Sequence, residues 1–244
     1  FTGGLSGAKE ANITGWGNTD GGIYRQAVIW LNKNAEKNSH ISVGFSEPAD
    51  FYIPELRGDL LADNQFSGYL QKGEYIIALT HNSELEHTYR MLYPETFLKP
   101  LYEYKVDSVP LIKIWKNEKK YLKNDVNKLE TKEIKLIPQV DKGKAKWDLG
   151  EQKRIVRVEI EFKNDLNCAP LTLGYIQASK DGDNWTLLPE TYPGEPIEVV
   201  GVQPRESSIV MPIAGISARY ISFIIEPQNA CVLNIDKSRV LVLQ

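Results

Sequence analysis

The sequence of 244 residues is poor in the residues that build disulfide scaffolds and metal centres, with only two cysteines and three histidines. Cys168 and Cys231 are too few for a disulfide scaffold or a four-cysteine zinc site. They are either two buried small apolar side chains or one bridge formed in an oxidising compartment. His40, His81 and His87 lack the spacing of metal ligands. We therefore expect neither a metal nor a cofactor.

Long apolar runs and a strong net charge are also absent. No run of about 18 consecutive apolar residues is present, so no transmembrane helix is expected. A net charge of −3 argues against a large surface for nucleic acid. The contents of apolar residues, 42%, and of charged residues, 25%, are those of a globular protein. The chain begins with Phe1 and shows no signal peptide, so we expect a processed product or a piece of a longer protein.

A lysine-rich stretch separates two unlike halves of the sequence. Residues 118–146 contain nine lysines against five acidic residues, and large apolar residues are scarce over the first part of this stretch. This composition favours a linker at residues 118–130. We expect an α/β layered domain over residues 1–117 and an all-β domain over residues 131–244.

The first half alternates helical and strand-like patterns. Apolar residues recur at helical spacing in residues 23–35, and a capping box at residues 83–86 opens a helix expected to end near residue 93. A short helix is expected at residues 48–56. Strands are expected at residues 40–45, 75–80, 101–106 and 110–115, with a tight turn at Asp107 and Ser108 joining the last two.

The second half shows short strand-like runs separated by turn residues and almost no helical period. The runs are residues 135–138, 155–162, 171–179, 186–188, 197–200, 208–212, 219–226 and 239–243. Many short strands at near-regular spacing predict an all-β sandwich. Alternation in the second run places Val156, Val158 and Ile160 on its buried face.

Three motifs of the second half resemble those of discoidin-like domains, also called coagulation-factor C-type domains. They are WDLG at residues 147–150 followed by IVRVEI at residues 155–160, IQASKDGDNW at residues 176–185 and ARYI at residues 218–221. The resemblance implies a jelly-roll sandwich, often used to bind glycans and sometimes phospholipid or protein, with the ligand held by variable loops at one end.

Within these motifs, each residue has an expected physical role. Asp181 and Gly182 supply the positive φ of a turn between strands. Trp185 is expected to return into the sandwich core rather than to offer a platform for sugar. Arg219 is expected to form a structural charge-assisted hydrogen bond inside the fold rather than to contact a ligand.

The variable loops match no motif, so the resemblance transfers no binding residue. Residues 191–194 place Tyr192 next to a Pro-Gly turn, and the face of such a ring can stack on a sugar. Tyr192 is therefore the candidate ligand-binding residue, and the alternative is an ordinary solvent-facing loop tyrosine.

The first half resembles the segment after the last membrane helix of polytopic glycosyltransferases related to protein O-mannosyltransferases and aminoarabinose transferases. The resemblance lies in FTGGLSGA at residues 1–8, GWG at 15–17, YRQAVIWLNKNA at 24–35 and YEYKVDSVPLIKIW at 102–115. Gly15, Gln26 and Ser108 depart from the family's pattern. The resemblance implies a place on the extracytoplasmic face of the membrane, next to the protein's own transmembrane region.

No catalytic residue can be carried over, because the catalytic acids and the site for the lipid-linked sugar donor of that family lie in segments outside this chain. The sequence therefore indicates a non-catalytic extracytoplasmic part of a membrane-bound glycosyltransferase. Its expected task is to recognise or position a glycan or a glycosylated acceptor. The alternative is a free-standing secreted carbohydrate-binding protein. A soluble α/β enzyme with a sugar-binding appendage is disfavoured by the lack of any catalytic constellation.

Overall fold

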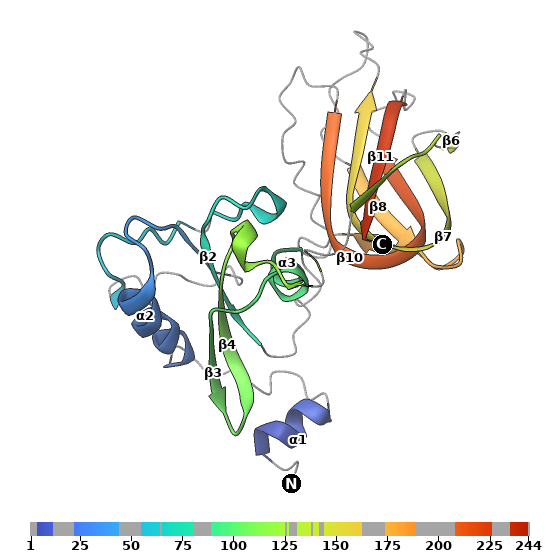
Figure 1. Ribbon diagram of the computed structural model, residues 1–244. Coiled ribbons are helices and arrows are strands. Elements are labelled where there is room, and N and C mark those ends of the chain that lie inside the picture. Colours follow the sequence, from blue (N-terminus) through green and yellow to red (C-terminus); the bar gives the residue numbers. More distant parts are fainter. Residues whose placement is uncertain are drawn as a thin grey trace. The chain divides into compact units, whose positions relative to one another are not determined.

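The chain forms two compact units, Phe1–Asn124 and Asp125–Gln244 (Figure 1). The computed structural model describes residues 4–11, 22–43, 55–63, 65–80, 89–124, 126, 131–137, 139–141, 144–162, 174–188, 208–225 and 235–243. Within these residues the longest helix has 13 residues, and no helix has the length and apolar character that a membrane span requires.

The first unit is built on a four-stranded sheet with the strand order β1-β2-β4-β3. The strands are β1 (Ile41–Val43), β2 (Tyr75–Leu79), β3 (Tyr102–Val106) and β4 (Val109–Lys116). β1 pairs with β2 in parallel, and the other pairs are antiparallel. The predicted β3–β4 hairpin is confirmed, and its turn residues Asp107 and Ser108 have φ of 49° and 66°. A type I′ turn requires positive φ at both positions.

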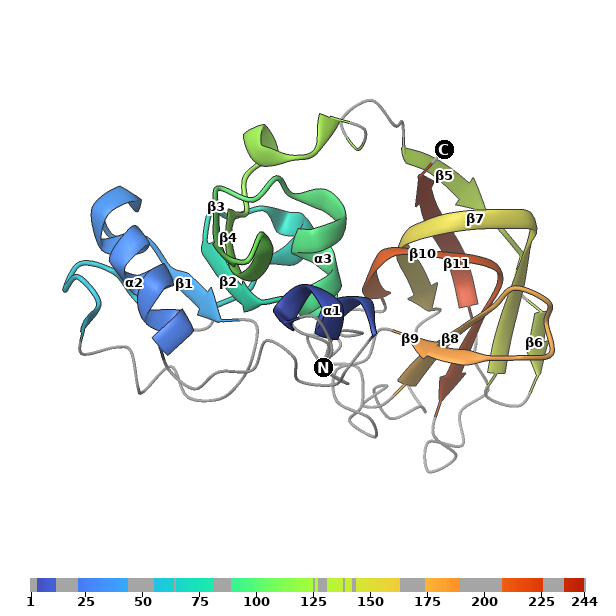
Figure 2. The ribbon, with the colours of Figure 1, turned by 90° about the horizontal axis from the view of Figure 1, so that it is seen from below.

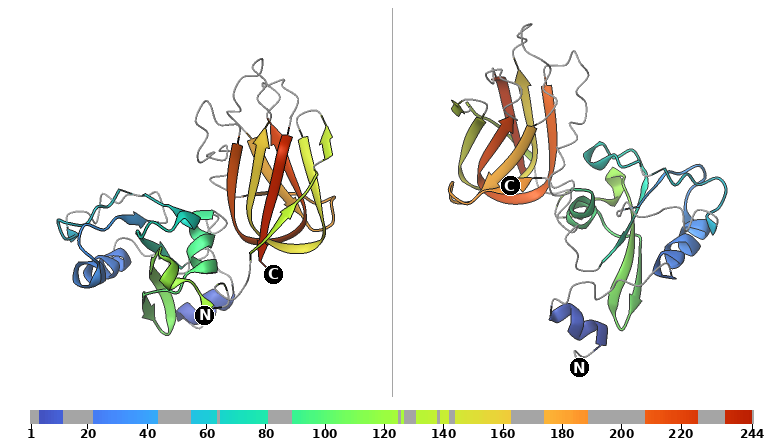
Figure 3. Two further views of the ribbon diagram at one scale, coloured as in Figure 1. Left: turned by 45° about the horizontal axis from the view of Figure 1, so that its top comes forward. Right: turned by 180° about the vertical axis from the view of Figure 1, so that it is seen from behind.

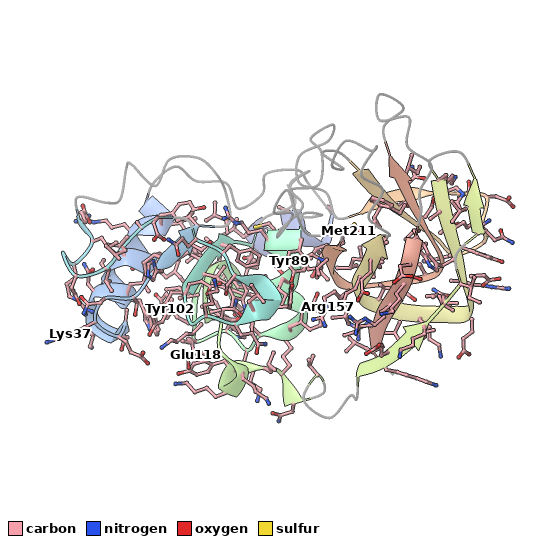
Figure 4. The ribbon with its side chains drawn as sticks, turned by 90° about the horizontal axis from the view of Figure 1, so that it is seen from above. Lys37, Tyr89, Tyr102, Glu118, Arg157 and Met211 are labelled. Carbon is pink, nitrogen blue, oxygen red and sulfur yellow. The ribbon has the colours of Figure 1, made fainter. Side chains whose placement is uncertain are left out.

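Helix α2 (Gly22–Asn34) covers one face of this sheet (Figure 2). Ala27 and Leu31 are fully buried there, as the predicted helical spacing requires. Trp30 stacks on Tyr102 of β3 with a distance of 5.6 Å between the ring centroids, and Figure 4 shows Tyr102 in this region. The helix predicted at residues 23–35 is thus confirmed.

Helix α3 (Tyr89–Phe97) contacts the other face of the sheet, where its Glu95 pairs with Lys113 of β4 at 2.6 Å. The predicted end at residue 93 is wrong. The helix continues through Pro94, whose carbonyl accepts a hydrogen bond from the Leu98 amide at 3.0 Å. The predicted helix start at residues 83–86 lies outside the described residues, as does most of the helix expected at 48–56. Two short helices, α1 (Gly4–Glu10) and η3 (Gly68–Leu70), also belong to this unit.

The first part of the predicted linker is attached to the first unit. The 3₁₀ helix η5 (Lys119–Tyr121) follows β4, and the Lys99 amide donates to the Tyr121 carbonyl at 2.8 Å. The Lys123 amide donates to the Phe97 carbonyl at 2.9 Å. Residues 118–123 are therefore hydrogen-bonded to the first unit, and a linker that makes no such contacts would begin at residue 124 or later. The domain bounds proposed from the sequence stay a prediction.

The second unit is all-β over its described residues. Its strands are β5 (Thr131–Lys135), β6 (Gln139–Asp141), β7 (Lys144–Phe162), β8 (Gly174–Ser179), β9 (Thr186–Leu188), β10 (Ser208–Ile225) and β11 (Ile235–Leu243). All pairs are antiparallel, in the order β5-β11-β7-β10-β8-β9 with β6 on β7. The all-β character predicted for the second half is confirmed.

Strands β7 and β10 bend, so that each contributes to two layers (Figures 1 and 3). The first part of β7 pairs with β6 and with the second part of β10. The second part of β10 also pairs with β8, and β8 pairs with β9. The second part of β7 pairs with the first part of β10 and with β11. Gly150 and Gly215 have φ of 77° and 75°, a conformation that favours glycine, where the strands turn. The layers enclose one core, which includes Trp147, Val158, Ile213, Phe223 and Val240. The second unit is therefore a β-sandwich.

Several predicted strands have different bounds in the structure. The expected strands at residues 208–212 and 219–226 are parts of the single strand β10, and the one at 155–162 is part of β7. β5 ends at Lys135, where the expected strand was to begin. The strand expected at residues 197–200 lies outside the described residues.

A β-bulge corrects the predicted alternation in β7. Leu241 pairs with Arg157 and its neighbour Val242 pairs with Ile155, so Val156 is left without a partner in β11. Ile155 is fully buried and Val156 is only half-buried, contrary to the expectation for Val156. The alternation holds for Val158 and Ile160, which are fully buried.

Candidate functional site

Two of the three sequence motifs of the second half meet in one ion pair. Arg219 of β10 donates from Nε and Nη2 to the two carboxylate oxygens of Asp148 of β7, at 2.8 Å and 2.9 Å. The Arg219 hydrogen bond, together with the Gly150 amide, holds the pKa of the Asp148 carboxyl below its usual range. The predicted structural, charge-assisted role of Arg219 is confirmed, although the pair lies at the surface rather than inside the fold.

The third motif forms the turn between β8 and β9. The Asp181 carboxylate accepts hydrogen bonds from the Asn184 amide at 2.8 Å, the Asn184 side chain at 2.8 Å and the Asp183 amide at 2.9 Å. These bonds, together with one from the Ser179 hydroxyl, hold the pKa of Asp181 well below its usual range. Gly182 has the expected positive φ, 90°, whereas Asp181 does not have a positive φ, contrary to the expectation for that residue. A Cβ atom at position 182 would lie 3.3 Å from the Tyr220 ring.

Trp185 is half-buried and does not fill the core, which corrects the sequence-based expectation. Its Nε1 donates to the Gly182 carbonyl at 3.0 Å, so the turn itself holds the ring. The Lys144 and Lys146 ammonium groups lie 5.1 Å and 5.3 Å from its ring centroid, within the range of cation–π attraction. The core position belongs to Trp147, whose side chain is 1% exposed.

Lys146 also lies close to a second aromatic ring, that of Tyr220. The Lys146 ammonium group lies 4.9 Å from the centroid of Tyr220, and the Arg219 guanidinium carbon lies 4.9 Å from that centroid as well. Trp185 and Tyr220 therefore border one cationic surface, which we call the Trp185–Tyr220 surface and define by Lys144, Lys146, Trp185 and Tyr220. Such a surface offers aromatic area, N–H donors and positive charge.

Sequence reasoning missed the two lysines of this surface and assigned them only to a lysine-rich stretch. A signal was available, because Lys144 and Lys146 alternate with Ala145 and Trp147 at the period of a strand. The alternation puts both lysines on the outer face, opposite the buried Ala145 and Trp147.

A second feature of this unit is the convergence of strand ends. Phe162 pairs with Ile235, and Ser208 pairs with Glu161, so the end of β7 and the starts of β10 and β11 lie together (Figure 1). At the other edge, Ile225 pairs with Gly174, where β10 ends and β8 begins. The connections over residues 163–173, 189–207 and 226–234 start and finish at these strand ends.

The predicted ligand-binding residue Tyr192 belongs to the connection over residues 189–207 and lies outside the described residues. Cys168 and Cys231 also lie outside them, so the question of a bridge stays open. Among the residues that are described, no group of three or more histidine, cysteine and acidic side chains could hold a metal ion.

The first unit contains a buried polar network around Glu74, which is 5% exposed. Its carboxylate accepts hydrogen bonds from the Ser67 amide at 2.8 Å, from the Ser67 hydroxyl and from the Asn117 side chain at 2.8 Å. Asn117 also accepts from the Tyr93 hydroxyl at 3.1 Å. Burial, with a smaller contribution from the nearby Glu74 charge, raises the pKa of Tyr93 to about 12. Because these donors and acceptors satisfy one another inside the unit, the network stabilises the fold rather than presenting a reactive group.

His40 is the one histidine among the described residues, and its Nδ1 lies 2.6 Å from the Asp63 carboxylate. Asp63 in turn accepts from the Gln65 amide at 3.2 Å. The described residues place no nucleophilic side chain in hydrogen-bonding contact with this His–Asp pair.

Comparisons with known proteins find neither a matching protein-family model nor a matching curated protein. Solved structures do match. The C-terminal domain of a chitobiase from Bacteroides fragilis is 19% identical, with a TM-score of 0.32, over 41% of this chain and 64% of that one. A chitobiase fragment from Bacteroides thetaiotaomicron is 20% identical, with a TM-score of 0.31, over 41% of this chain and 60% of that one. The chain thus spans less than two thirds of either chitobiase fragment.

A third match is a fucose binding module from Streptococcus pneumoniae. It is 10% identical, with a TM-score of 0.30, over 49% of this chain and 97% of that one.

Proposed function

We propose that the second unit recognises a glycan with the connections at its converging strand ends. The observation that carries the proposal is the pairing of strand ends, Phe162 with Ile235 and Ile225 with Gly174, since residues 163–173, 189–207 and 226–234 connect the described strand ends in sequence. Binding residues concentrate on loops that a rigid scaffold positions. The sequence resemblance to discoidin-like domains, in which such loops hold the ligand, supports the same assignment.

Tyr192 is the proposed contact residue, because its ring can stack on the C–H face of a sugar. Burial of one such face is worth about 1–2 kcal/mol, whereas millimolar binding requires about 4 kcal/mol, so we expect weak binding with a Kd of roughly millimolar or higher. Titration of the 15N-labelled chain with a panel of neutral glycans should therefore be followed by NMR. We expect Tyr192→Ala to abolish the response with little change in the melting temperature, because a loop side chain contributes little to core packing.

Tyr220→Phe is the matched control, because it alters an aromatic side chain of the described framework without removing its ring. It should bind neutral glycans as the wild type does. Unchanged binding by Tyr192→Ala, or shifts confined to residues 1–117, would show that this site assignment is wrong.

We further propose that the chain is a non-catalytic extracytoplasmic part of a membrane-bound glycosyltransferase, in which the second unit positions a glycan acceptor. The support is the sequence resemblance of residues 1–117, including the β3–β4 hairpin with its turn at Asp107 and Ser108. The alternative is a free-standing secreted carbohydrate-binding protein. The coding sequence upstream of Phe1 distinguishes them: about a dozen apolar spans support the first, and a signal peptide alone supports the second.

A further inference from the structure

The Trp185–Tyr220 surface lies on the outer face of one sandwich layer and is made by described strands and the β8–β9 turn. Lys146 pairs with Ser222 across β7 and β10, and Asp148 pairs with Tyr220. Directly paired residues share a face of the sheet, so these side chains lie on the face opposite the buried Trp147 and Ile221. The surface is therefore separate from the sandwich core.

Two like charges are held close together on this surface. Lys144 and Lys146 both lie within 5.3 Å of the Trp185 ring centroid, and neither forms an ion pair with any carboxylate among the described residues. Cation–π contacts to the rings restrain both ammonium groups before any ligand arrives. The Lys146 charge contributes to lowering the pKa of Asp148, but the hydrogen bonds of that carboxylate come from Arg219. Two restrained ammonium groups that no carboxylate pairs with directly favour the binding of an anion.

The other charged groups around this surface are largely engaged. Arg219 and Asp148 neutralise each other in their two-fold hydrogen-bonded pair. The Asp181 carboxylate is occupied by the turn that carries Trp185. Asp183 is exposed in that turn, two residues from Trp185, so its charge would add to that of Asp148 in opposing an incoming anion.

A buried hydroxyl on the same face gives a second, independent indication of a ligand. Ser222 is fully buried, and its Oγ has no hydrogen-bond partner among the described residues. It stands opposite Lys146 in the strand register and two residues from Tyr220. A buried hydroxyl without a partner is costly, and native proteins retain few of them.

We propose that the Trp185–Tyr220 surface binds an acidic saccharide, with its carboxylate or sulfate between Lys144 and Lys146 and its ring against Trp185 or Tyr220. Phosphate or sulfate alone would use the lysines but not the aromatic area. The proposal depends on the proposed function only in taking the ligand to be a saccharide, because it uses neither Tyr192 nor the connections at the strand ends.

The test is an NMR titration of the 15N-labelled full chain with a galacturonate trisaccharide, read at the Trp185 indole N–H and the amides of β7 and β10. The fully methyl-esterified trisaccharide keeps the sugar rings and removes the charge, and inorganic sulfate keeps a charge and removes the rings. We expect the acidic trisaccharide to bind roughly tenfold more tightly than either, in line with two surface charge contacts.

Two double variants separate local from general charge effects. Lys144→Gln with Lys146→Gln should weaken binding of the acidic trisaccharide roughly tenfold. Lys132→Gln with Lys135→Gln removes an equal amount of positive charge from exposed positions of the edge strand β5, and this variant should bind the acidic trisaccharide as the wild type does. Asp183→Asn should tighten binding, because it removes an opposing charge.

Three results would overturn the proposal: no shift at Trp185, equal losses in the two double variants, or sulfate binding as tight as that of the trisaccharide. The Tyr192→Ala variant keeps the two sites distinguishable. If the surface is the acidic site, this variant still binds the galacturonate trisaccharide, whereas loss of that binding would assign the ligand to the strand-end connections.

Discussion

Trp147 and Ser238 connect the two layers of the sandwich by a buried hydrogen bond. The indole Nε1 of Trp147, on β7, donates to the Ser238 hydroxyl of β11 at 2.9 Å, and that hydroxyl donates to the Leu136 carbonyl at 2.8 Å. Trp147 pairs with β10 in one layer, whereas Ser238 pairs with the distal part of β7 in the other. The serine thus satisfies the one polar atom of the largest side chain in this core.

Ser238→Ala should destabilise the second unit, because the buried indole N–H would lose its acceptor. We expect a loss of about 1–3 kcal/mol in the free energy of unfolding, measured by urea denaturation. Ser222→Ala is a matched control at another fully buried serine of this unit, whose Oγ has no partner among the described residues. It should be neutral or slightly stabilising, and equal losses in the two variants would contradict the assigned role of Ser238.

The Asp148–Arg219 pair predicts a dependence of stability on pH. Arg219 holds the folded-state pKa of Asp148 below its ordinary value of 3.8, so the pair contributes stability above that value. The contribution is lost as pH falls toward the folded-state pKa. Asp148→Asn should therefore lower the melting temperature at pH 7, and the difference from the wild type should shrink below about pH 4. Asp236→Asn, an exposed position on β11, is the control, and a difference that stays constant with pH would contradict the prediction.

Local chemistry made parts of this fold predictable from the sequence. The Asp107–Ser108 turn, the glycine turn at Gly182 and the pairing role of Arg219 all depend on short-range geometry or on one strong donor–acceptor match. The helical spacing of Ala27 and Leu31 likewise identified the face of α2 that is buried.

Other parts depend on tertiary pairing that one strand cannot reveal. Ile155 and Val156 are both apolar, so only the register with β11 shows which one is buried. Trp147 and Trp185 both follow strand-like patterns, and the layer opposite each of them decides which ring fills the core. For the candidate site, the alternation of Lys144 and Lys146 with buried residues could be recognised in the sequence. Their proximity to Trp185 could not, because it depends on how β7 and the β8–β9 turn lie together in the fold.

The turn at Ser108 offers a route to a more stable first unit. A non-glycine residue at φ 66° is strained by roughly 1 kcal/mol, and glycine relieves that strain. Ser108→Gly should raise the free energy of unfolding by up to about 1 kcal/mol, whereas Ser108→Val should lower it, because a β-branched residue fits this conformation poorly. Urea denaturation measures both free energies of unfolding, and a loss for Ser108→Gly or a gain for Ser108→Val would show that backbone strain at Ser108 does not limit the stability.

Tyr93 should make the first unit sensitive to alkali. Its pKa is raised from 10.0 to about 12, chiefly because burial disfavours the charged phenolate. A group whose folded-state pKa is raised contributes stability that is fully present below its unfolded-state pKa and is lost as pH rises through the folded-state value. The wild type should therefore lose about 2 kcal/mol between pH 10 and pH 12 through this residue.

Tyr93→Phe lacks the ionising group and should escape this loss. Near neutral pH the variant should be less stable than the wild type by about 1 kcal/mol, because the hydrogen bond to Asn117 is missing. The two unfolding free energies should therefore cross between pH 10 and pH 12, and at pH 12 the variant should be the more stable by about 1 kcal/mol. Tyr121→Phe, at a more exposed ring, controls for the loss of a hydroxyl and should remain parallel to the wild type. Parallel curves for Tyr93→Phe and the wild type would instead mean that this hydroxyl ionises equally well in the folded and unfolded chains, contrary to its burial between Gln71 and Asn117.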